Sequence, residues 1–340
     1  MDNTVNFFRE NIYKDGEYSY PAAYGFVPNI RAYLHPDSEN KNLPCMIVVP
    51  GGGYCMVVNL EGEPVALDFY ERGYNVFVLT YTTDITTAFP LKFQPLNDIS
   101  RAVRYIRKNS GRFGINESKV TICGFSAGGH VCATLGTHYN DVIDSDEELN
   151  KISNRPDSMI LGYPVITSGE YTHEYSMISL LGRNPSEEDL LYFSLEKNVT
   201  PDTPPAFVWQ TVEDNLVPVE NSMMFAESLR ANKVPYAYYA FPHGIHGLSA
   251  SNNLVKTGQF GEPYTMEQMF AAVDAVKTGK SVGVSDERIN ELLEQFKEPD
   301  ESDKKNADSS EESAHNGPQF YDDVSLWINL AEIWLKGLNP

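Results

Sequence analysis

The sequence predicts an α/β fold organised around a doubly wound, mostly parallel β-sheet. From residue 44 onward, short apolar runs alternate with longer amphipathic segments, which is the pattern of strands alternating with helices. Several runs, such as MIVV and VFVL, are almost continuously apolar, as expected of parallel strands that helices cover on both faces. The chain has 340 residues, enough to bury a substantial core. We expect residues 1–340 to form a single domain of this class.

The apolar runs give the expected strands, at residues 44–51, 75–81, 119–125, 158–165, 205–212 and 236–242. The amphipathic segments between them predict helices at residues 63–72, 97–109, 127–137 and 219–232. The first 43 residues are rich in aromatic side chains, and we expect them to add antiparallel strands at an edge of the sheet.

Residues 140–204 interrupt this alternation around the expected strand at 158–165. Their connections are long and polar and contain proline, and such segments commonly carry functional loops. We therefore expect residues 140–204 to form a lid or substrate-binding loops around one core strand.

Residues 251–321 form a larger insertion ahead of a C-terminal helix expected at 322–338. Ser285 is a candidate N-cap for the second of two helices that we expect in the insertion. The tract KEPDESDKKNADSSEESAHNGP is polar and mostly acidic, which predicts a flexible, solvated linker. The apolar C-terminal helix is expected to return to the sheet. The two helices of the insertion are predicted from apolar side chains at helical spacing, which are Met266, Met269, Phe270 and Val273 for the first and Ile289, Leu292, Leu293 and Phe296 for the second.

The formal net charge of −21 argues against a nucleic-acid partner, because a nucleic-acid site requires a concentrated basic face. The N-terminal residues contain no apolar segment typical of a signal peptide, and no apolar run is long enough to span a bilayer. We therefore expect a cytoplasmic protein that does not insert into a membrane. The four cysteines fit free thiols in a reducing compartment.

The most informative motif is Gly124-Phe125-Ser126-Ala127-Gly128, which lies between an expected strand and an expected helix. It matches the pattern G-x-S-x-G, in which a serine occupies a sharp turn from strand to helix. The glycines leave room for the turn, and the amides at the start of the helix point toward the serine hydroxyl. Ser126 is therefore a candidate nucleophile.

A serine hydroxyl needs a neighbouring base, and the base in turn needs an orienting acid. The loop after the strand at 205–212 offers Glu213 and Asp214, and the loop after the strand at 236–242 offers His243 and His246. The order serine, acid, histidine is the one that this kind of fold requires. The two histidines could also suggest a metal pair, but no further histidine or cysteine lies near them in the sequence, so we expect no metal site.

A run of three glycines, Gly51, Gly52 and Gly53, ends the first expected strand. Backbone amides in such a run can approach a substrate carbonyl without a side chain in the way. The amides of Gly52 and Gly53, together with that of Ala127 after the serine, are the candidate oxyanion donors.

Eight segments in order resemble bacterial α/β-hydrolase esterases, in particular the acetyl-xylan-esterase-like group, which is related to hormone-sensitive lipases and carboxylesterases. The resemblance covers about residues 25–250 and the final helix. The segments that carry it are PGGGY, EGEPVA, GFSAGGH, LGYPV, LLGRNPS, TPDTPPAF, VEDNLVPVENSMMFAESLR and FPHGIHGL.

The resemblance implies that Ser126 is the nucleophile, Asp214 the triad acid and His246 the general base. The family motif D-x-x-V-P selects Asp214 over Glu213, and G-x-H-G selects His246 over His243. A serine esterase follows, acting through an acyl-enzyme on short-chain esters, with acetylated sugars or xylo-oligosaccharides as the expected substrates. Because water completes the cycle, no cofactor is required.

Three further residues are candidates for substrate contact: Tyr54, Glu63 and His173. Glu63 and its neighbour Glu61 are also explained as a charge pair that is favourable at the start of a helix, which is the interpretation we prefer. His173 lies on the expected lid, and His130 is interpreted as a packed structural histidine. The alternatives to an esterase are a serine amidase or peptidase of the same fold and a non-catalytic binding protein. We leave open whether the chain forms a homo-oligomer.

Overall fold

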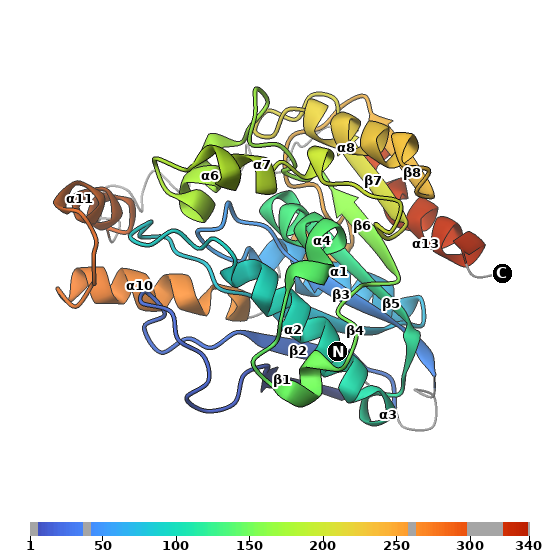
Figure 1. Cartoon of the computed structure of the whole chain (residues 1–340), viewed down its shortest axis with the longest axis horizontal. Helices are drawn as coiled ribbons and strands as arrows, with labels where there is room; N and C mark the ends of the chain where they lie inside the picture. The colour runs from blue at the N-terminus through green and yellow to red at the C-terminus, as the bar shows by residue number, and fades with distance from the viewer. Residues whose placement is uncertain (1–5, 37–41, 258–262, 298–321, 339–340) are drawn as a thin grey trace.

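A single mixed β-sheet runs through the part of the chain that the computed structural model describes, which comprises residues 6–36, 42–257, 263–297 and 322–338 (Figure 1). The strands lie side by side in the order β1-β2-β4-β3-β5-β6-β7-β8. They are β1 (Asn6–Asn11), β2 (Asn29–Leu34), β3 (Leu43–Val49), β4 (Asn75–Thr80), β5 (Ile115–Phe125), β6 (Ser158–Gly162), β7 (Ala206–Thr211) and β8 (Tyr236–Phe241).

The helices of the described residues connect and cover these strands. They are η1 (Asn59–Glu61), α1 (Glu63–Glu71), α2 (Gln94–Lys108), α3 (Ser110–Phe113), α4 (Ser126–His138), η2 (Tyr139–Asp141), α5 (Glu147–Asn150), α6 (Glu174–Leu181), α7 (Glu187–Tyr192), η3 (Leu195–Lys197), α8 (Glu220–Ala231), α9 (Asn253–Thr257), η4 (Tyr264–Met266), α10 (Glu267–Lys277), α11 (Asp286–Gln295), η6 (Val324–Leu326) and α13 (Trp327–Leu338), where η marks a 3-10 helix.

The predicted fold class is confirmed. Strands β3 to β8 pair in parallel, whereas β1 and β2 add to one edge in antiparallel pairing, as predicted for the N-terminal residues. Each predicted strand is present, with shifts at its ends. The strand expected at 158–165 ends at Gly162 because the backbone of Tyr163 turns to a positive φ of 36°, which is incompatible with an extended strand.

Helices cover both faces of the sheet, which explains why the strands are apolar on both sides. Alternate residues of β3 face opposite layers: Cys45 and Ile47 pack with α2, α4 and α8, while Met46 and Val48 pack with α1 and α13. The C-terminal helix returns to the sheet as predicted, and the Trp327 ring stacks on that of Trp209 at 5.2 Å. The carboxyl ends of the parallel strands are thereby held rigidly at one edge of the layered core.

Helices α10 and α11 occupy the predicted insertion. Ser285 caps α11 by accepting the amide N–H of Arg288, as predicted. Met269 and Val273 of α10 and Leu292 of α11 are buried in a third apolar cluster that also contains Cys55. The predicted apolar faces were partly wrong, because Phe270 and Leu293 are exposed. The acidic tract predicted at residues 297–318 lies, apart from its first residue, outside the described residues.

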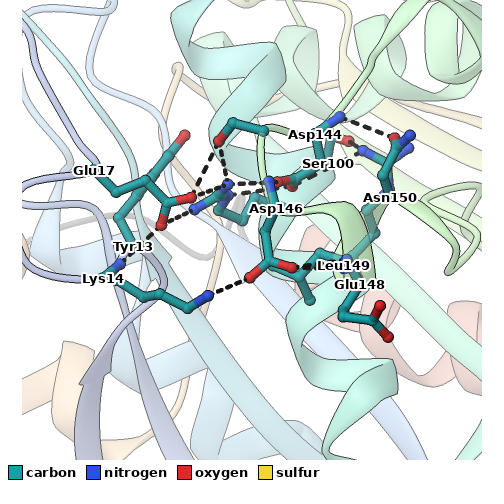
Figure 2. A network of polar contacts seen from close by, with 12 residues as sticks. Tyr13, Lys14, Glu17, Ser100, Asp144, Asp146, Glu148, Leu149 and Asn150 are labelled. Atoms are coloured by element: carbon teal, nitrogen blue, oxygen red, sulfur yellow. Dashed lines mark hydrogen bonds and ion pairs between the residues drawn. The ribbon is translucent and has the colours of Figure 1, made fainter.

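The N-terminal segment is held to α2 and to the loop before α5 by a polar network (Figure 2). The guanidinium group of Arg101 pairs with Glu17, at 2.6 Å, and with Asp144. Lys14 pairs with Asp146, also at 2.6 Å. Because the Arg101 side chain is almost completely buried, this pairing fixes the segment between β1 and β2 to the core. None of the helices in the described part of the chain has the length and apolar character needed to cross a bilayer.

Candidate active site

Ser126 lies at the junction of β5 and α4, in a backbone conformation that a serine rarely adopts. Its φ is +51°, so the chain reverses sharply and lifts the side chain away from the strand. The two flanking glycines are required by contact. A Cβ atom on Gly124 would lie 2.3 Å from the carbonyl oxygen of Gly128, and one on Gly128 would lie 2.1 Å from that of Val49.

The structure brings the three predicted triad side chains together. The Ser126 hydroxyl lies 2.9 Å from Nε2 of His246, and Nδ1 of His246 lies 2.8 Å from Oδ2 of Asp214. His246 is carried by the loop after β8 and Asp214 by the loop after β7. Both loops leave the carboxyl ends of parallel strands next to the Ser126 turn, which explains how residues so far apart in the sequence meet.

Asp214 is held as a carboxylate. Its Oδ1 accepts the amide N–H groups of Leu216 and Val217, each at 2.9 Å, and its Oδ2 accepts a side-chain N–H of Gln210 at 3.2 Å. Burial opposes ionisation, but the hydrogen bonds from His246 and from the two amides outweigh it, so the pKa of Asp214 lies below its ordinary value. An ionised Asp214 accepts a hydrogen bond from Nδ1–H of His246, which leaves Nε2 unprotonated and able to take the hydroxyl proton of Ser126.

The neighbouring acid and histidine do not join this chain of hydrogen bonds. Glu213 and His243 contact each other at 3.1 Å, and both side chains are more than half exposed. The geometry therefore selects Asp214 and His246 from the two pairs that the sequence offered. Within the described residues, no group of three or more histidine, cysteine, aspartate or glutamate side chains is arranged to hold a metal ion.

The glycine run forms a tight loop beside the serine. Gly52 and Gly53 have φ values of 124° and 61°, and the carbonyl of Gly52 accepts the amides of Cys55 and Met56. A Cβ on Gly52 would lie 2.3 Å from the carbonyl oxygen of Met56, so only glycine fits there. This turn leaves the amides of Gly52 and Gly53 without an acceptor among the described residues. The amide of Ala127 lies in the first turn of α4, where a helix offers no backbone acceptor.

The structure contradicts two of the three predicted substrate contacts. The ring of Tyr54 is only 1% exposed, and its hydroxyl hydrogen-bonds Nδ1 of His130 at 2.7 Å. Burial lowers the pKa of His130 to about 4, so its neutral ring joins Tyr54 to the carbonyl of Phe193 and is structural, as predicted. Glu63 is also buried, and it accepts the hydroxyl of Tyr33 in the layer of α1. A side chain's direction at these two positions is set by packing that the sequence pattern does not reveal.

His173 lies close to the candidate triad. Its Nδ1 hydrogen-bonds the Ser176 hydroxyl at 2.7 Å, and that hydroxyl lies 3.9 Å from the place a Cβ on Gly53 would take. Burial, and then the nearby His246, lower the pKa of His173. A neutral imidazole next to the glycine loop suits a donor or acceptor toward a substrate, so the contact between His173 and substrate stays a prediction.

Sequence reasoning missed the role of Glu61. The sequence interpretation treated it as part of a charge pair at the start of a helix, but the side chain is only 4% exposed. One of its oxygens accepts the amide of Gly51 at 2.5 Å, and the other accepts the hydroxyl of Tyr163 at 2.7 Å. The EGEP segment gave the only signal, and the sequence does not reveal that Tyr163 lies beside it.

Comparison with known proteins assigns the chain to a family. The family model described as BD-FAE matches residues 32–229. The chain belongs to the BD-FAE family. The resemblance to acetyl-xylan-esterase-like and carboxylesterase proteins is therefore confirmed, as is the α/β-hydrolase fold.

Two curated proteins and one solved structure illustrate the relationship of this BD-FAE family member to others. It is 56% identical to endo-1,4-beta-xylanase B of Butyrivibrio fibrisolvens over 79% of the chain, and 30% identical to an acetylxylan esterase of Xylanibacter ruminicola over 62% of the chain. Each alignment spans only 42% of the relative's own length. The structure of an acetyl ester-xyloside bifunctional hydrolase from Caldicellulosiruptor lactoaceticus matches with a TM-score of 0.67 and 35% identity, covering 83% of this chain and 100% of that one.

Proposed function

We propose that the chain is a serine esterase that removes short acyl groups, chiefly acetyl, from xylo-oligosaccharides or related sugars. The observation that carries this proposal is the continuous hydrogen-bonded series Ser126, His246 and Asp214. The amides of Gly52 and Gly53, which have no acceptor in the described part of the chain, follow Gly51, and Gly51 adjoins Ser126. A nucleophile, a base with an orienting acid and amide donors are the parts that acyl transfer requires.

The reaction would proceed in two halves. Nε2 of His246 takes the proton of the Ser126 hydroxyl as the serine oxygen bonds to the ester carbonyl carbon. The tetrahedral intermediate then expels the alcohol, which receives that proton from His246, and an acyl-serine is left. Water attacks the acyl-serine in the same way, giving its proton to His246, and the carboxylic acid leaves as the proton returns to the oxygen of Ser126.

Two features of the site would lower the barrier to these steps. The amides of Gly52, Gly53 and Ala127 would donate to the negative oxygen of each tetrahedral intermediate, and removing one such donor typically costs about 10²–10³ in rate. The ionised Asp214 would stabilise the imidazolium form of His246. All the donors are backbone amides, so their positions are set by the fold before substrate arrives.

The relatives support the choice of substrate class. One is named as an acetylxylan esterase, one as a xylanase and one as an acetyl ester-xyloside bifunctional hydrolase. A xylose-containing substrate is the chemistry that these three names share, and two of them add an acetyl ester.

Hydrolysis assays on the full chain and its Ser126→Ala variant test the proposal. The substrates are p-nitrophenyl acetate, p-nitrophenyl octanoate, an aminoacyl p-nitroanilide and acetylated xylo-oligosaccharides. We expect the acetate and the acetylated oligosaccharides to be the fastest, and Ser126→Ala to reduce kcat about 10⁴-fold or more. Ser118→Ala, at the exposed far end of β5, serves as the matched control. Faster turnover of the anilide would instead favour an amidase, and no turnover of any substrate would favour a binding protein.

A further inference from the structure

A buried carboxylate lies directly under the candidate active site and has no role in the reaction described above. Glu61 ends the short helix η1, ten residues after Gly51. No lysine or arginine among the described residues forms an ion pair with it. Burying a carboxylate without a cation is costly, and a chain that keeps such a group next to a catalytic centre usually uses it there.

The first contact of Glu61 is with the glycine loop. Its Oε2 accepts the Gly51 amide at 2.5 Å, which closes the loop of residues 51–61 on itself. A Cβ on Gly51 would lie 2.7 Å from the carbonyl oxygen of Phe125, 2.8 Å from Cβ of Ser126 and 2.9 Å from Oε2 of Glu61. The carboxylate, the nucleophile residue and the start of the glycine loop therefore meet at one point. Gly51 directly precedes Gly52 and Gly53, the two residues of this loop whose amides the reaction would use.

The second contact of Glu61 leads to the candidate base. Its Oε1 accepts the Tyr163 hydroxyl at 2.7 Å, and the centre of the Tyr163 ring lies 4.8 Å from that of His246, with the rings inclined at 68°. The amide of Tyr163 donates to the carbonyl of Trp209 at 2.7 Å, so the residue is fixed at its backbone as well as at its hydroxyl. The imidazole of His246 thus rests against a ring that Glu61 holds in place.

We propose that Glu61 is a positioning residue: its two oxygens set the glycine loop through Gly51 and the imidazole of His246 through Tyr163. This inference rests on the proposed esterase function. A single group that fixes both the glycine loop and His246 would hold the oxyanion amides and the base at a constant position relative to each other. Misplacing such groups by about 1 Å can cost roughly 100-fold in rate, without changing how tightly the substrate binds.

The chain provides a matched control for this role. Glu63 lies two residues further on, is also buried at 6% exposure, and accepts the hydroxyl of Tyr33 at 3.1 Å. The pair of Glu63 and Tyr33 therefore has the same chemistry as that of Glu61 and Tyr163. This pair joins β2, α1 and η4, since the Tyr33 hydroxyl also contacts that of Tyr264 at 3.1 Å.

The test measures kcat and KM on p-nitrophenyl acetate for Glu61→Ala, Glu61→Gln, Glu63→Ala and Glu63→Gln, with the melting temperature of each full-length variant. We expect Glu61→Ala to lower kcat about 100-fold while KM stays within about threefold. Glu61→Gln should recover most of the loss, because its amide oxygen can accept from Gly51 while its NH₂ group donates to Tyr163. The Glu63 variants should lower the melting temperature and leave kcat within about threefold of the wild-type value.

Tyr163→Phe and Tyr33→Phe give a second comparison that does not remove a buried carboxylate. Tyr163→Phe should lower kcat about tenfold at unchanged KM, and Tyr33→Phe should leave both constants unchanged. The positioning role is overturned if folded Glu61→Ala keeps its kcat, if Glu61→Gln is no better than Glu61→Ala, or if the Glu63 and Tyr33 variants lose as much kcat. If Glu61→Ala does not fold, the two tyrosine variants decide. The proposed function is judged separately, since it fails if the wild type is inactive, if Ser126→Ala is active, or if the wild type hydrolyses the anilide faster than the acetate.

Discussion

At the scale of single residues, the candidate site depends on a strained serine and on the glycines that leave room for it. Ser126 has a positive φ, which is disfavoured for a residue with a Cβ and persists only where surrounding structure enforces it. The enforcing contacts come from Gly124 and Gly128, where a Cβ would overlap with backbone oxygens. Local strain at the serine is thus offset by close packing of β5, α4 and β3.

Asp214 and Glu213 are adjacent carboxylates with different environments, and this contrast gives a prediction. Asp214→Asn should lower kcat on p-nitrophenyl acetate by about 10³–10⁴-fold, because an amide that donates to Nδ1 of His246 would favour the wrong tautomer. Glu213→Gln changes the exposed neighbour and should leave kcat within about twofold. Steady-state kinetics on both variants provides the check. Equal losses in the two variants would contradict the assignment of Asp214.

The order of motifs predicted Ser126 and the two loops that carry its partners, because the topology of a parallel sheet brings the ends of its strands to one edge. The choice of Asp214 and His246 within those loops came from the resemblance to a known family. The amides of Gly52, Gly53 and Ala127 stay predicted as the oxyanion donors. Tyr54 and Glu63 were wrongly predicted as substrate contacts, since sequence spacing does not show which way a side chain points. Glu61 was missed because its burial depends on Tyr163, which lies 102 positions away.

At the scale of elements, the insertion packs against the loops that surround the candidate site. Cys55 and Met56, just after the glycine loop, contact the apolar cluster of α10 and α11. Arg288 of α11 donates to the carbonyl of Ile85 and to the hydroxyl of Tyr175, at 2.7 and 3.0 Å. Helix α11 lies beside α6 in Figure 1. The helices of the insertion therefore pack against α6 and the residues just after the glycine loop, and support both.

The two adjacent leucines of α11 test how firmly this helix is attached. Leu292 is 1% exposed and Leu293 is 39% exposed. Leu292→Ala should reduce the free energy of unfolding by about 2–4 kcal/mol, because it leaves a cavity in the cluster. Leu293→Ala should change it by less than about 1 kcal/mol. Chemical denaturation measures both, and indistinguishable values would mean that α11 does not contribute a buried face.

The presence of helices in the insertion was predictable from apolar spacing, but the faces were predicted imperfectly. Phe270 and Leu293 fit the helical pattern yet point outward. Each face is selected by its partner, in this case Cys55, Ile85 and the other helix of the pair. A pattern of spacing can identify a helix more reliably than it can identify which of two apolar stripes is buried.

At the scale of the whole molecule, the N-terminal segment is held by charge pairing as well as by strand pairing. The salt bridge and hydrogen bonds from Arg101 are the largest cause that lowers the pKa of Glu17, to about 2, compared with an ordinary value of 4.5. A carboxylate with a lowered pKa in the folded protein stabilises it above the ordinary pKa. That contribution disappears as pH falls through the folded value.

A Glu17→Gln variant tests this dependence on pH. At pH 7 it should be less stable than the wild type by about 1 kcal/mol, allowing for partial solvent screening of the pair. The difference should shrink as the pH falls from about 4.5 to about 2 and then disappear, because the wild-type carboxyl is protonated there. Unfolding monitored by circular dichroism at several pH values gives the comparison. Glu147→Gln, an exposed residue of α5, is the control, and a difference that persists undiminished to pH 2 would contradict the assignment.

The mostly parallel sheet with helices on both faces could be predicted because the alternation of strands and helices leaves few topologies. The Arg101 network could not be predicted, since it joins three segments whose proximity follows only from the folded sheet. The Arg101 network nevertheless helps to explain how the segment that contains β1 and β2 is held to the rest of the sheet.

The most direct test of the central claim is to treat the full-length protein with a fluorophosphonate probe and locate the adduct by peptide mass spectrometry. A serine activated by His246 and flanked by oxyanion donors should react once, on the peptide that contains Ser126, with loss of p-nitrophenyl acetate hydrolysis in proportion to labelling. An active protein that carries no adduct on Ser126, or carries it on another serine, would contradict the account.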